Sequence, residues 1–287
     1  MRTWFITGTS SGIGWHLTEQ LIARGERVAA TARNLEVLTD LLAVASGRLW
    51  TAELDVTDFA AVRATVGRAF ADLGRIDMVV SNAGYGQFGA AEELSDELIT
   101  RQLDTNLIGS IQLARTVIPH LREQGGGRII QISSAGGQTA VPGMSLYHAS
   151  KWGIEGFLEA VAGEVATFDI EITLVEPGFA ATGFYSPSSI QLAPALEVYR
   201  QTSLGELRDV FASGAAAAYA PGDPAKMAAA IIDSADASPA PRRLVLGSDA
   251  YESIERALQE RLAALRSQEQ AARSTDIDRP EATATPR

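Results

Sequence analysis

The sequence predicts an α/β fold in which a doubly wound parallel sheet of about seven strands is covered by helices on both faces. Short apolar runs rich in β-branched residues alternate along the chain with longer segments of helical periodicity. Strands buried on both faces have nearly continuous apolar runs, and the helices between them supply the crossovers that parallel strands need. Right-handed crossovers then give the doubly wound arrangement.

Each predicted element follows from its own pattern of apolar residues. Leu17, Leu21 and Ile22, for example, recur at helical spacing after the first apolar run. The alternation has no break long enough for a domain boundary, so we expect residues 1–272 to form one domain. The predicted strands are residues 3–7, 27–32, 49–54, 76–81, 128–133, 170–176 and 243–247, and the predicted helices include residues 13–24, 58–73, 96–122 and 146–167.

Three segments depart from this alternation. Residues 183–222 contain several prolines and glycines between short apolar pieces, which is typical of a functional loop or lid. Residues 249–272 have a charged helical pattern and are predicted to form a C-terminal helix. Residues 273–287 are rich in Ser, Thr, Pro and charged residues, so we expect a disordered tail there.

Composition narrows the possible partners. Lys and Arg total 24 and Asp and Glu total 35, which gives a net charge of −11 and argues against a nucleic-acid partner. The absence of cysteine excludes disulfides and thiol catalysis. There is no apolar run of the ~18 residues that a membrane span needs, and no signal-peptide pattern at the start. We therefore expect a cytoplasmic protein with no membrane partner.

A glycine-rich turn follows the first predicted strand and leads directly into a helix. Unpaired backbone N–H groups and the positive end of the helix dipole favour a pyrophosphate at such a turn. Gly8 permits the tight turn, Gly12 lets the backbone approach the ligand, and Gly14 lets helix and strand pack closely. This Rossmann-type turn predicts a dinucleotide site made of Gly8, Thr9, Ser10, Ser11, Gly12, Ile13 and Gly14.

The spacing of these glycines, three residues and then one, resembles that of the classical short-chain dehydrogenase/reductase family. The resemblance covers about residues 1–247, because the family's later motifs follow in order. It implies an oxidoreductase that interconverts a ketone or aldehyde and an alcohol by hydride transfer. It also implies a homodimer or homotetramer that pairs through the two long helices near residues 96–122 and 146–167.

The end of the second strand predicts the choice of cofactor. In a dinucleotide site this end lies beside the adenosine ribose, where an acidic residue binds the 2′-hydroxyl and an arginine accommodates a 2′-phosphate. Ala32 stands where the family has the acidic residue, and Arg33 follows it. We therefore expect NADP(H), with Arg33 on the phosphate. The alternative is that Arg33 is a solvated residue at the start of a helix.

The resemblance assigns three further segments to the cofactor. Asp55 and Val56 follow the third strand, where the family contacts adenine, although Asp55 could instead cap the next helix. The Asn82-Ala83-Gly84 turn would lie against the cofactor and steady the sheet. The segment that begins at Pro177 and Gly178 and ends at Thr182 resembles the one that positions the nicotinamide carboxamide and the phosphates.

Tyr147 and Lys151 form the predicted acid–base pair. Residues four apart share a helix face, so the two side chains lie together. A phenol has an ordinary pKa of about 10, and a nearby ammonium favours the phenolate and lowers that pKa. Tyr147 could then donate a proton in reduction or accept one in oxidation. Lys151 could also hold the hydroxyls of the nicotinamide ribose.

The resemblance adds two residues to the catalytic set. Ser134 precedes Tyr147 by the family's spacing of 13 residues and would orient the substrate carbonyl, a role for which Ser133 is one residue out of register. Asn106 lies 28 residues before Ser134 and would hold a water in a proton relay. No metal is expected, because His16 and His120 have no ligand pattern around them. His148 is expected to pack beside the catalytic tyrosine.

Two alternatives to the reductase stay open. One is an epimerase or dehydratase on the same scaffold, and the other is a non-enzymatic NADP(H)-binding sensor. The sensor would be free to lose Ser134, Tyr147 or Lys151, and all three are present. The expected partner is a small carbonyl or alcohol whose identity the sequence does not specify. An apolar substrate pocket could be lined by residues that could equally belong to the core, namely Tyr85, Phe88, Val141, Met144, Phe179, Phe184 and Tyr185.

Overall fold

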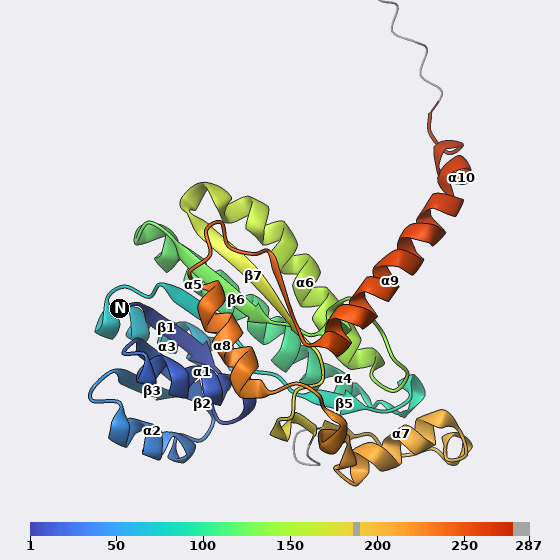
Figure 1. The fold of residues 1–287 in the computed structure, drawn as a ribbon, viewed down its shortest axis with the longest axis horizontal. Helices are drawn as coiled ribbons and strands as arrows, with labels where there is room; N and C mark the ends of the chain where they lie inside the picture. The colour runs from blue at the N-terminus through green and yellow to red at the C-terminus, as the bar shows by residue number, and fades with distance from the viewer. Residues whose placement is uncertain (186–189, 278–287) are drawn as a thin grey trace, which may run out of the picture.

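The computed structural model describes residues 1–185 and 190–277, and a seven-stranded sheet runs through its centre (Figure 1). The strands are all parallel and lie in the order β3-β2-β1-β4-β6-β7-β9, which confirms the predicted doubly wound fold. The chain begins in the middle of the sheet, winds to one edge and then returns to build the other. The strands are β1 (Thr3–Thr7), β2 (Arg27–Ala32), β3 (Leu49–Glu53), β4 (Met78–Ser81), β6 (Gly127–Ile132), β7 (Ile170–Pro177) and β9 (Arg243–Leu246).

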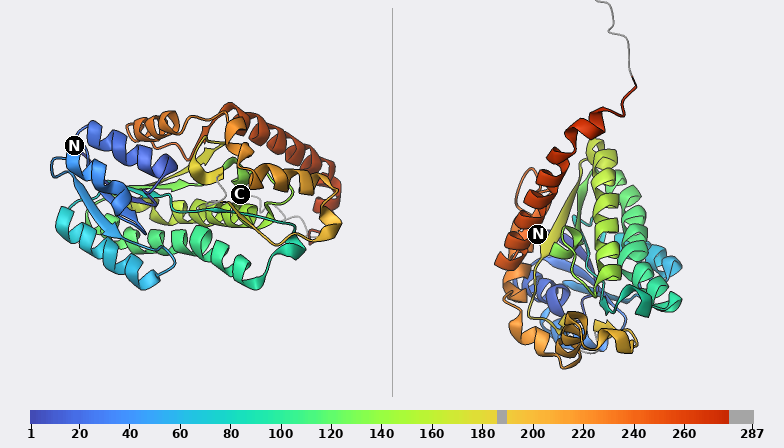
Figure 2. Two further views of the ribbon diagram at one scale, coloured as in Figure 1. Left: turned by 90° about the horizontal axis from the view of Figure 1, so that it is seen from below. Right: turned by 90° about the vertical axis from the view of Figure 1, so that its right-hand side faces the viewer.

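Helices cover both faces of the sheet (Figure 2). Neighbouring side chains of a strand point to opposite faces. Phe5 of β1 is therefore buried in one apolar cluster, while Trp4 and Ile6 are buried in the other. The first cluster contains side chains of α3 (Phe59–Leu73), α5 (Gly109–Glu123) and α6 (Ser145–Val165), and the second contains side chains of α1 (Gly12–Ala23), α2 (Thr39–Val44) and α8 (Pro224–Ser234).

The predicted helix over residues 96–122 is three segments rather than one. Helix α4 (Asp96–Leu103) continues through a π-helical turn at Asp104–Ile108 into α5. The wider turn brings the chain close to the end of β3, since a Cβ on Gly109 would lie 2.9 Å from the carbonyl oxygen of Val56. Such π turns often occur at functional sites, and this one contains Asn106.

The region predicted to be a lid contains regular structure that is tied to the body. Strand β8 (Ile190–Leu192) pairs in parallel with β5 (Gly86–Phe88), and helix α7 (Ser203–Ala212) follows it. Arg208 of α7 forms an ion pair with the fully buried Glu93 and donates to the carbonyl of Ala193 at 2.5 Å. Residues 186–189 of this predicted lid lie outside the described residues.

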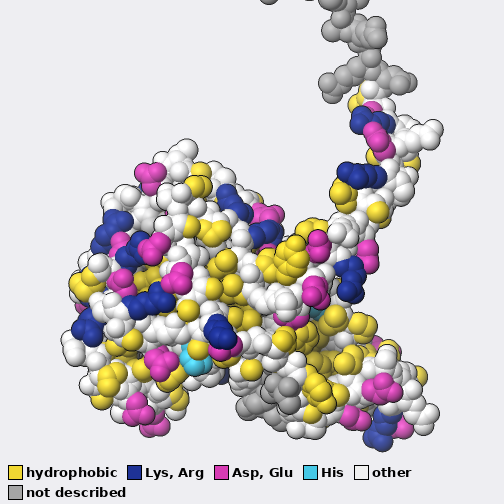
Figure 3. Space-filling model, in the orientation of Figure 1, with side chains coloured by type: hydrophobic (Ala, Val, Ile, Leu, Met, Phe, Trp, Pro, Cys, Tyr) yellow, Lys and Arg dark blue, Asp and Glu magenta, His cyan; other side chains and the backbone are white. Residues whose placement is uncertain are grey.

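The predicted C-terminal helix leaves the body of the molecule as α9 (Ser248–Ser267), and a turn at Gln268 separates it from α10 (Glu269–Arg273). On the face shown in Figure 3, apolar side chains gather where α9 departs from the body. In the part of the chain that the structure describes, no helix is long and apolar enough to cross a membrane. Residues 278–287 of the predicted tail lie outside it.

Candidate active site

A cleft of about 390 Å³ opens at the carboxyl ends of the central strands, where parallel sheets of this winding bind ligands. Most of the residues that the sequence assigned to cofactor and catalysis line this one cleft, although they come from segments far apart in the chain. They are Gly8, Ser10, Ser11, Gly12, Ile13, Arg33, Asp55, Val56, Asn82, Ala83, Gly84, Ser134, Tyr147, Lys151, Pro177, Gly178 and Thr182.

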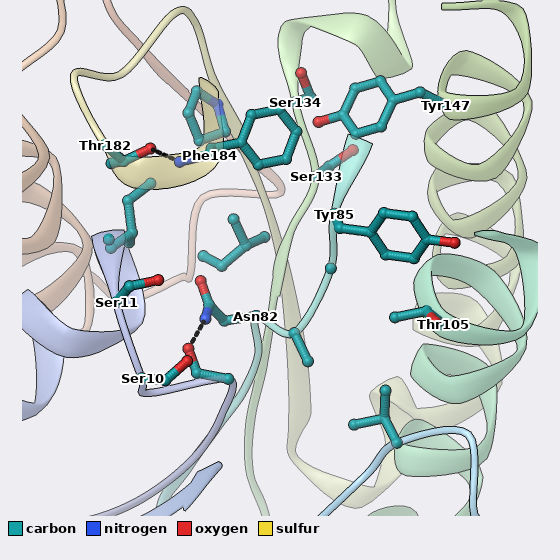
Figure 4. Close-up of a pocket in the computed structure, with 18 of the residues that line it drawn as sticks. Ser10, Ser11, Asn82, Tyr85, Thr105, Ser133, Ser134, Tyr147, Thr182 and Phe184 are labelled. Carbon is teal, nitrogen blue, oxygen red and sulfur yellow. Dashed lines mark hydrogen bonds between the residues drawn. The ribbon is translucent and has the colours of Figure 1, made fainter. Parts of the chain in front are cut away.

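The glycine-rich turn has the backbone that its sequence requires. Gly8 and Gly12 have φ angles of 69° and 58°, in the left-handed region that favours glycine. A Cβ on Gly14 would lie 2.4 Å from Nδ2 of Asn82, so only glycine lets α1 pack this closely. Asn82 Nδ2 donates to the carbonyls of Thr7 and Gly8 at 2.9 and 2.8 Å (Figure 4). The Asn82-Ala83-Gly84 turn therefore braces the glycine-rich turn.

Thr9 lies behind the cleft rather than in it. Its side chain is fully buried, and its hydroxyl donates to the carbonyl of Thr31 on β2 at 3.1 Å. Ser10 and Ser11 are the hydroxyl residues of the turn that line the cleft. The hydroxyl donors expected from this turn therefore come from these two serines, while Thr9 ties the turn to β2.

The end of the cleft near Asp55 combines a carboxylate with the cations Arg33 and Arg101. Asp58 caps α3 by accepting from the amides of its first turn, so the cap is not Asp55. Asp55 accepts from the backbone N–H and the hydroxyl of Thr57 at 2.9 and 2.8 Å. Burial of Asp55 acts to raise its pKa, but these hydrogen bonds and the charges of Arg33 and Arg101 hold that pKa below its ordinary value. Asp55 therefore stays ionised at neutral pH.

Tyr147 and Lys151 lie one turn apart near the start of α6, and both are more than nine-tenths buried. Lys151 Nζ donates to the carbonyl of Ile132 at the end of β6 at 2.9 Å. It lies 5.7 Å from the centre of the Tyr147 ring. The Tyr147 hydroxyl points toward Ser134 (Figure 4), whose hydroxyl acts to lower the pKa of the phenol. The structure thus brings these three predicted residues together.

Burial decides the protonation of this pair. It raises the pKa of the Tyr147 phenol to about 12, against the opposing effect of the Ser134 hydrogen bond. It lowers the pKa of Lys151 to about 8, against the opposing charge of Glu155. The sequence predicted that Lys151 depresses the pKa of Tyr147, whereas in this structure the desolvation of the phenol is the largest influence on that pKa and raises it. Tyr147 therefore holds its proton at neutral pH.

The loop after β6 fixes Ser134. Its hydroxyl oxygen accepts from the N–H of Gly136 at 3.0 Å, so the hydroxyl proton stays available to a ligand. His148 holds the same loop, because its Nδ1 lies 2.8 Å from the carbonyl of Gly136 and its Nε2 accepts from the N–H of Val141 at 3.0 Å. Burial lowers the pKa of His148. A neutral imidazole that braces the loop agrees with the packing role expected for this residue.

Asn106 lies behind the cleft, buried in the π turn. Its Oδ1 accepts from the backbone N–H of Tyr85 at 3.1 Å, and its Nδ2 donates to the carbonyl of Tyr85 at 2.9 Å. Nδ2 also lies 3.3 Å from the hydroxyl of Ser150 on α6. The side-chain amide thus positions Tyr85, which lines the cleft, and links it to α6.

The sequence reasoning missed several residues of the site. Arg101 and Thr105, on α4 and the π turn, and Gln191, on β8, line the cleft. Asp249, in the first turn of α9, accepts from the N–H of Phe179 at 2.7 Å and so braces the Pro177–Thr182 segment. The local sequence around these residues does not mark them as part of a site, because their place at the cleft depends on tertiary packing.

An apolar cluster adjoins Tyr147. The Phe184 ring packs edge-on against Tyr147 at 5.8 Å between centres, and Thr182 Oγ1 accepts from the N–H of Phe184 at 3.2 Å (Figure 4). The buried members of the apolar cluster are Phe88, Ala90, Met144, Tyr147, Ile190, Leu204, Phe211 and Ala216.

Among residues 1–185 and 190–277 there is no group of three or more His, Cys, Asp or Glu that could bind a metal.

Comparison with known protein families gives a match to the short chain dehydrogenase model over residues 2–192. Oxidoreductase BOA17 of Botryotinia fuckeliana is 37% identical over 254 residues, which cover 88% of this chain and 90% of that protein. The 3-ketodihydrosphingosine reductase of Bacteroides thetaiotaomicron is 35% identical over 204 residues, which cover 71% of this chain and 73% of the reductase.

Solved structures show the same likeness over a larger part of the chain. The crystal structure of a short-chain dehydrogenase from Streptomyces avermitilis matches with a TM-score of 0.88 and 36% sequence identity. The match covers 96% of this chain and 100% of that one. The similarity therefore extends over nearly the whole chain and its fold.

Proposed function

The chain belongs to the short-chain dehydrogenase family, whose members use a nicotinamide cofactor, and on this premise we propose that it is an NADP(H)-dependent carbonyl reductase or alcohol dehydrogenase. The observation that carries the proposal is the meeting of Ser134, Tyr147 and Lys151 in the cleft that the glycine-rich turn also lines. An acid–base group, a hydroxyl donor and a cation at one point suit proton transfer to a carbonyl oxygen.

The residues of the cleft fit a dinucleotide. The left-handed backbone at Gly8 and Gly12 turns N–H groups and the start of α1 toward the cleft, as a pyrophosphate site requires. A Cβ on Gly12 would lie 3.4 Å from Thr182, so a side chain there would fill the space between the two phosphate-binding segments. We expect Ser10 and Ser11 to bind phosphate and Asp55 to bind adenine. When bound, the nicotinamide supplies or accepts the hydride.

Tyr147 is the proposed general acid. Since its pKa is raised to about 12, the phenol is protonated at neutral pH and can give its proton to a carbonyl oxygen during reduction. Ser134 would orient that oxygen, because its own oxygen already accepts from Gly136 and leaves the hydroxyl proton to donate. The Lys151 ammonium would stabilise the phenolate that forms and bind the ribose hydroxyls. Asn106 would support this arrangement through Tyr85 and α6.

Ala32 and Arg33 support NADP(H) over NAD(H). Ala32, at the end of β2, is 3% exposed and brings no negative charge to the adenosine ribose. Arg33 follows it at the exposed rim of the cleft. A guanidinium there could bind a 2′-phosphate through two charge-assisted hydrogen bonds.

The surroundings of Tyr147 favour a ketone that carries a bulky apolar group. Phe184 lines the cleft and presents its apolar ring next to the proton donor, while Phe88 and Met144 are buried in the cluster behind it. One similar protein is named as a reductase of a 3-keto compound, which agrees with this reaction class. The proposed substrate is therefore a small carbonyl compound with an aliphatic, cyclic or aromatic substituent.

The test is the decay of NADPH absorbance with a panel of linear, cyclic and aromatic ketones, and the reverse assay with the corresponding alcohols. We expect ketone-dependent oxidation of NADPH by the wild-type protein and none by Tyr147→Phe. NADPH binding without turnover of any ketone or alcohol would favour the sensor. Isomerisation of the supplied compound, or loss of water from it, without net consumption of NADPH would favour the epimerase or dehydratase.

A further inference from the structure

A buried carboxylate lies behind the catalytic residues. Glu155 is on α6, one turn after Lys151, and is 2% exposed. Its oxygens accept from the Ser133 hydroxyl and from Gln138 Nε2, both at 2.5 Å, and from Arg243 Nη1 at 2.7 Å. One side chain thus joins the catalytic helix, the loop that carries Ser134, and the edge strand β9.

The loop is built around this carboxylate. Gly137 follows Ser134 in the 3₁₀ turn Ala135–Gly137, and a Cβ on it would lie 1.8 Å from Oε1 of Glu155. No other residue fits at Gly137 while Glu155 keeps its place. The neighbouring Ser133 also donates its backbone N–H to the carbonyl of Val175 on β7 at 2.7 Å. The position of Ser134 is therefore set by contacts on both sides, and Glu155 makes two of them.

The charges around Glu155 alternate in sign. Lys151 faces it from the preceding turn of α6, and Arg243 faces it from β9. Arg243 also pairs with Glu176 at the end of β7 and with Glu159 on the following turn of α6. The other titratable groups of α6 are Tyr147 and His148, which precede Lys151, and Glu164 near the end of the helix. A carboxylate with so little exposure requires these partners, because an unpaired buried charge is strongly destabilising.

We propose that Glu155 is a positioning residue of the active site, whose carboxylate fixes the loop that carries Ser134 and keeps Lys151 in its charged form. The proposal rests on the function proposed above, in which both residues act on the substrate or cofactor. Glu155 itself does not line the cleft and acts only through its neighbours. Its removal should therefore change the catalytic step and its pH dependence more than it changes the binding of NADPH.

Glu159 provides a matched control. It is on the same helix, one turn further, and pairs with the same Arg243, but its side chain is 49% exposed. Glu159→Gln and Glu155→Gln each remove one negative charge and keep the size of the side chain. Only Glu155→Gln removes a charge next to Lys151 and replaces one of the two oxygens that accept from Ser133 and Gln138 by an NH2 group.

The first readout does not need turnover. The chain has two lysines, Lys151 and Lys226, so a protein labelled with ¹³C at lysine Cε gives two signals whose pKa values are read by NMR titration. Opposite charges about 6 Å apart shift a pKa by about 0.5 to 2 units at effective dielectric constants of about 80 to 20. Glu155→Gln should lower the pKa of Lys151 by this amount. The pKa of the exposed Lys226 should stay unchanged, as should both values in Glu159→Gln.

The second readout is the pH profile of kcat with the best ketone. In Glu155→Gln, kcat should fall and its alkaline limb should move to lower pH, while KM for NADPH changes little. Glu155→Asp keeps the charge but shortens the side chain. Its alkaline limb of kcat should therefore lie at the wild-type pH, while its kcat stays below that of the wild type. Ser133→Ala removes only the hydroxyl contact, so it should lower kcat without moving the limb. These two variants carry the test if Glu155→Gln does not fold.

An unchanged pKa of Lys151 in Glu155→Gln would overturn the proposal. If Glu155→Gln does not fold, a wild-type kcat in both Glu155→Asp and Ser133→Ala would overturn it. A wild-type kcat and limb in Glu155→Gln would do the same. Failure of the proposed function looks different, because the wild-type protein itself would then oxidise no NADPH with any ketone. The NMR titration would still report whether Glu155 controls Lys151 in that case.

Discussion

Replacing Arg33 by alanine should remove most of the preference for NADPH over NADH. Arg33 is exposed at the rim of the cleft, and the charge of Asp55 lies close enough to interact with it. A hydrogen bond to a charged group contributes about 1.5–3 kcal/mol, which corresponds to about 10- to 100-fold in affinity. Because solvent screens an exposed guanidinium, we expect a preference nearer the lower end of that range. NADH has no 2′-phosphate, so its use should change little in Arg33→Ala.

The assay is kcat/KM for both cofactors in the wild type and in three variants. Arg33→Ala should reduce the ratio of NADPH to NADH use toward one, and a second substitution, Ala32→Asp, should carry it toward NADH. The added carboxylate would bind the ribose 2′-hydroxyl and repel a phosphate. Arg63→Ala removes an exposed arginine on α3 that does not line the cleft, and serves as the control. A wild type that uses NADH as well as NADPH would refute the assignment.

Three further changes test other parts of the site. Gly14→Ala would place a Cβ 2.4 Å from Nδ2 of Asn82, so it should cost about 1–3 kcal/mol of stability in thermal or denaturant unfolding, and unchanged unfolding would contradict this packing. Arg208→Ala leaves the buried Glu93 without its cation, so hydrogen exchange in α7 should become faster. KM for the ketone should rise while NADPH affinity stays unchanged. A wild-type KM and unchanged hydrogen exchange in α7 would contradict this role of the ion pair. Because burial lowers the pKa of Lys151 to about 8, the ammonium is lost as pH rises through that value, and kcat should fall on the alkaline side; a kcat that stays level there would exclude the role of the cation.

The sheet and much of the cleft could be predicted because their signals are local. Each central strand is a short apolar run, and the glycine-rich turn is identified by glycines that directly follow β1. The cleft residues follow the ends of strands, and the ends of parallel strands meet at one edge of a sheet. The resemblance to the short-chain dehydrogenase/reductase family then assigns residues as far apart as Gly8 and Thr182 to one site.

The contacts that hold this site together could not be predicted, because they depend on tertiary packing. Glu155 lies in a long helix, where a glutamate usually indicates a solvated surface, and its partner Arg243 is 88 residues away. Thr9 belongs to the glycine-rich turn, but its hydroxyl faces β2 and not the cleft. The π turn at Asp104–Ile108 has no distinguishing apolar pattern, so the sequence predicts an uninterrupted helix there.

The pairing of β5 with β8 shows the same limit. Each strand has three residues, and the register joins Gly86 to Ile190, from opposite sides of the catalytic helix in the sequence. Strands this short have too few residues for a two-residue period to be recognised. The sequence therefore indicates a loop where the structure has a small parallel sheet and a helix.

The central claim is that Tyr147 donates the proton to the carbonyl, and Tyr147→Phe tests it most directly. The substitution removes only the hydroxyl of a side chain that is 9% exposed and packed against Phe184. Measurement of kcat with the best ketone, together with NADPH affinity by fluorescence titration, separates chemistry from binding. We expect a loss of about 10²–10⁴-fold in kcat, the usual contribution of a positioned acid–base group, with NADPH affinity unchanged. A variant that binds NADPH and keeps most of the wild-type kcat would contradict it.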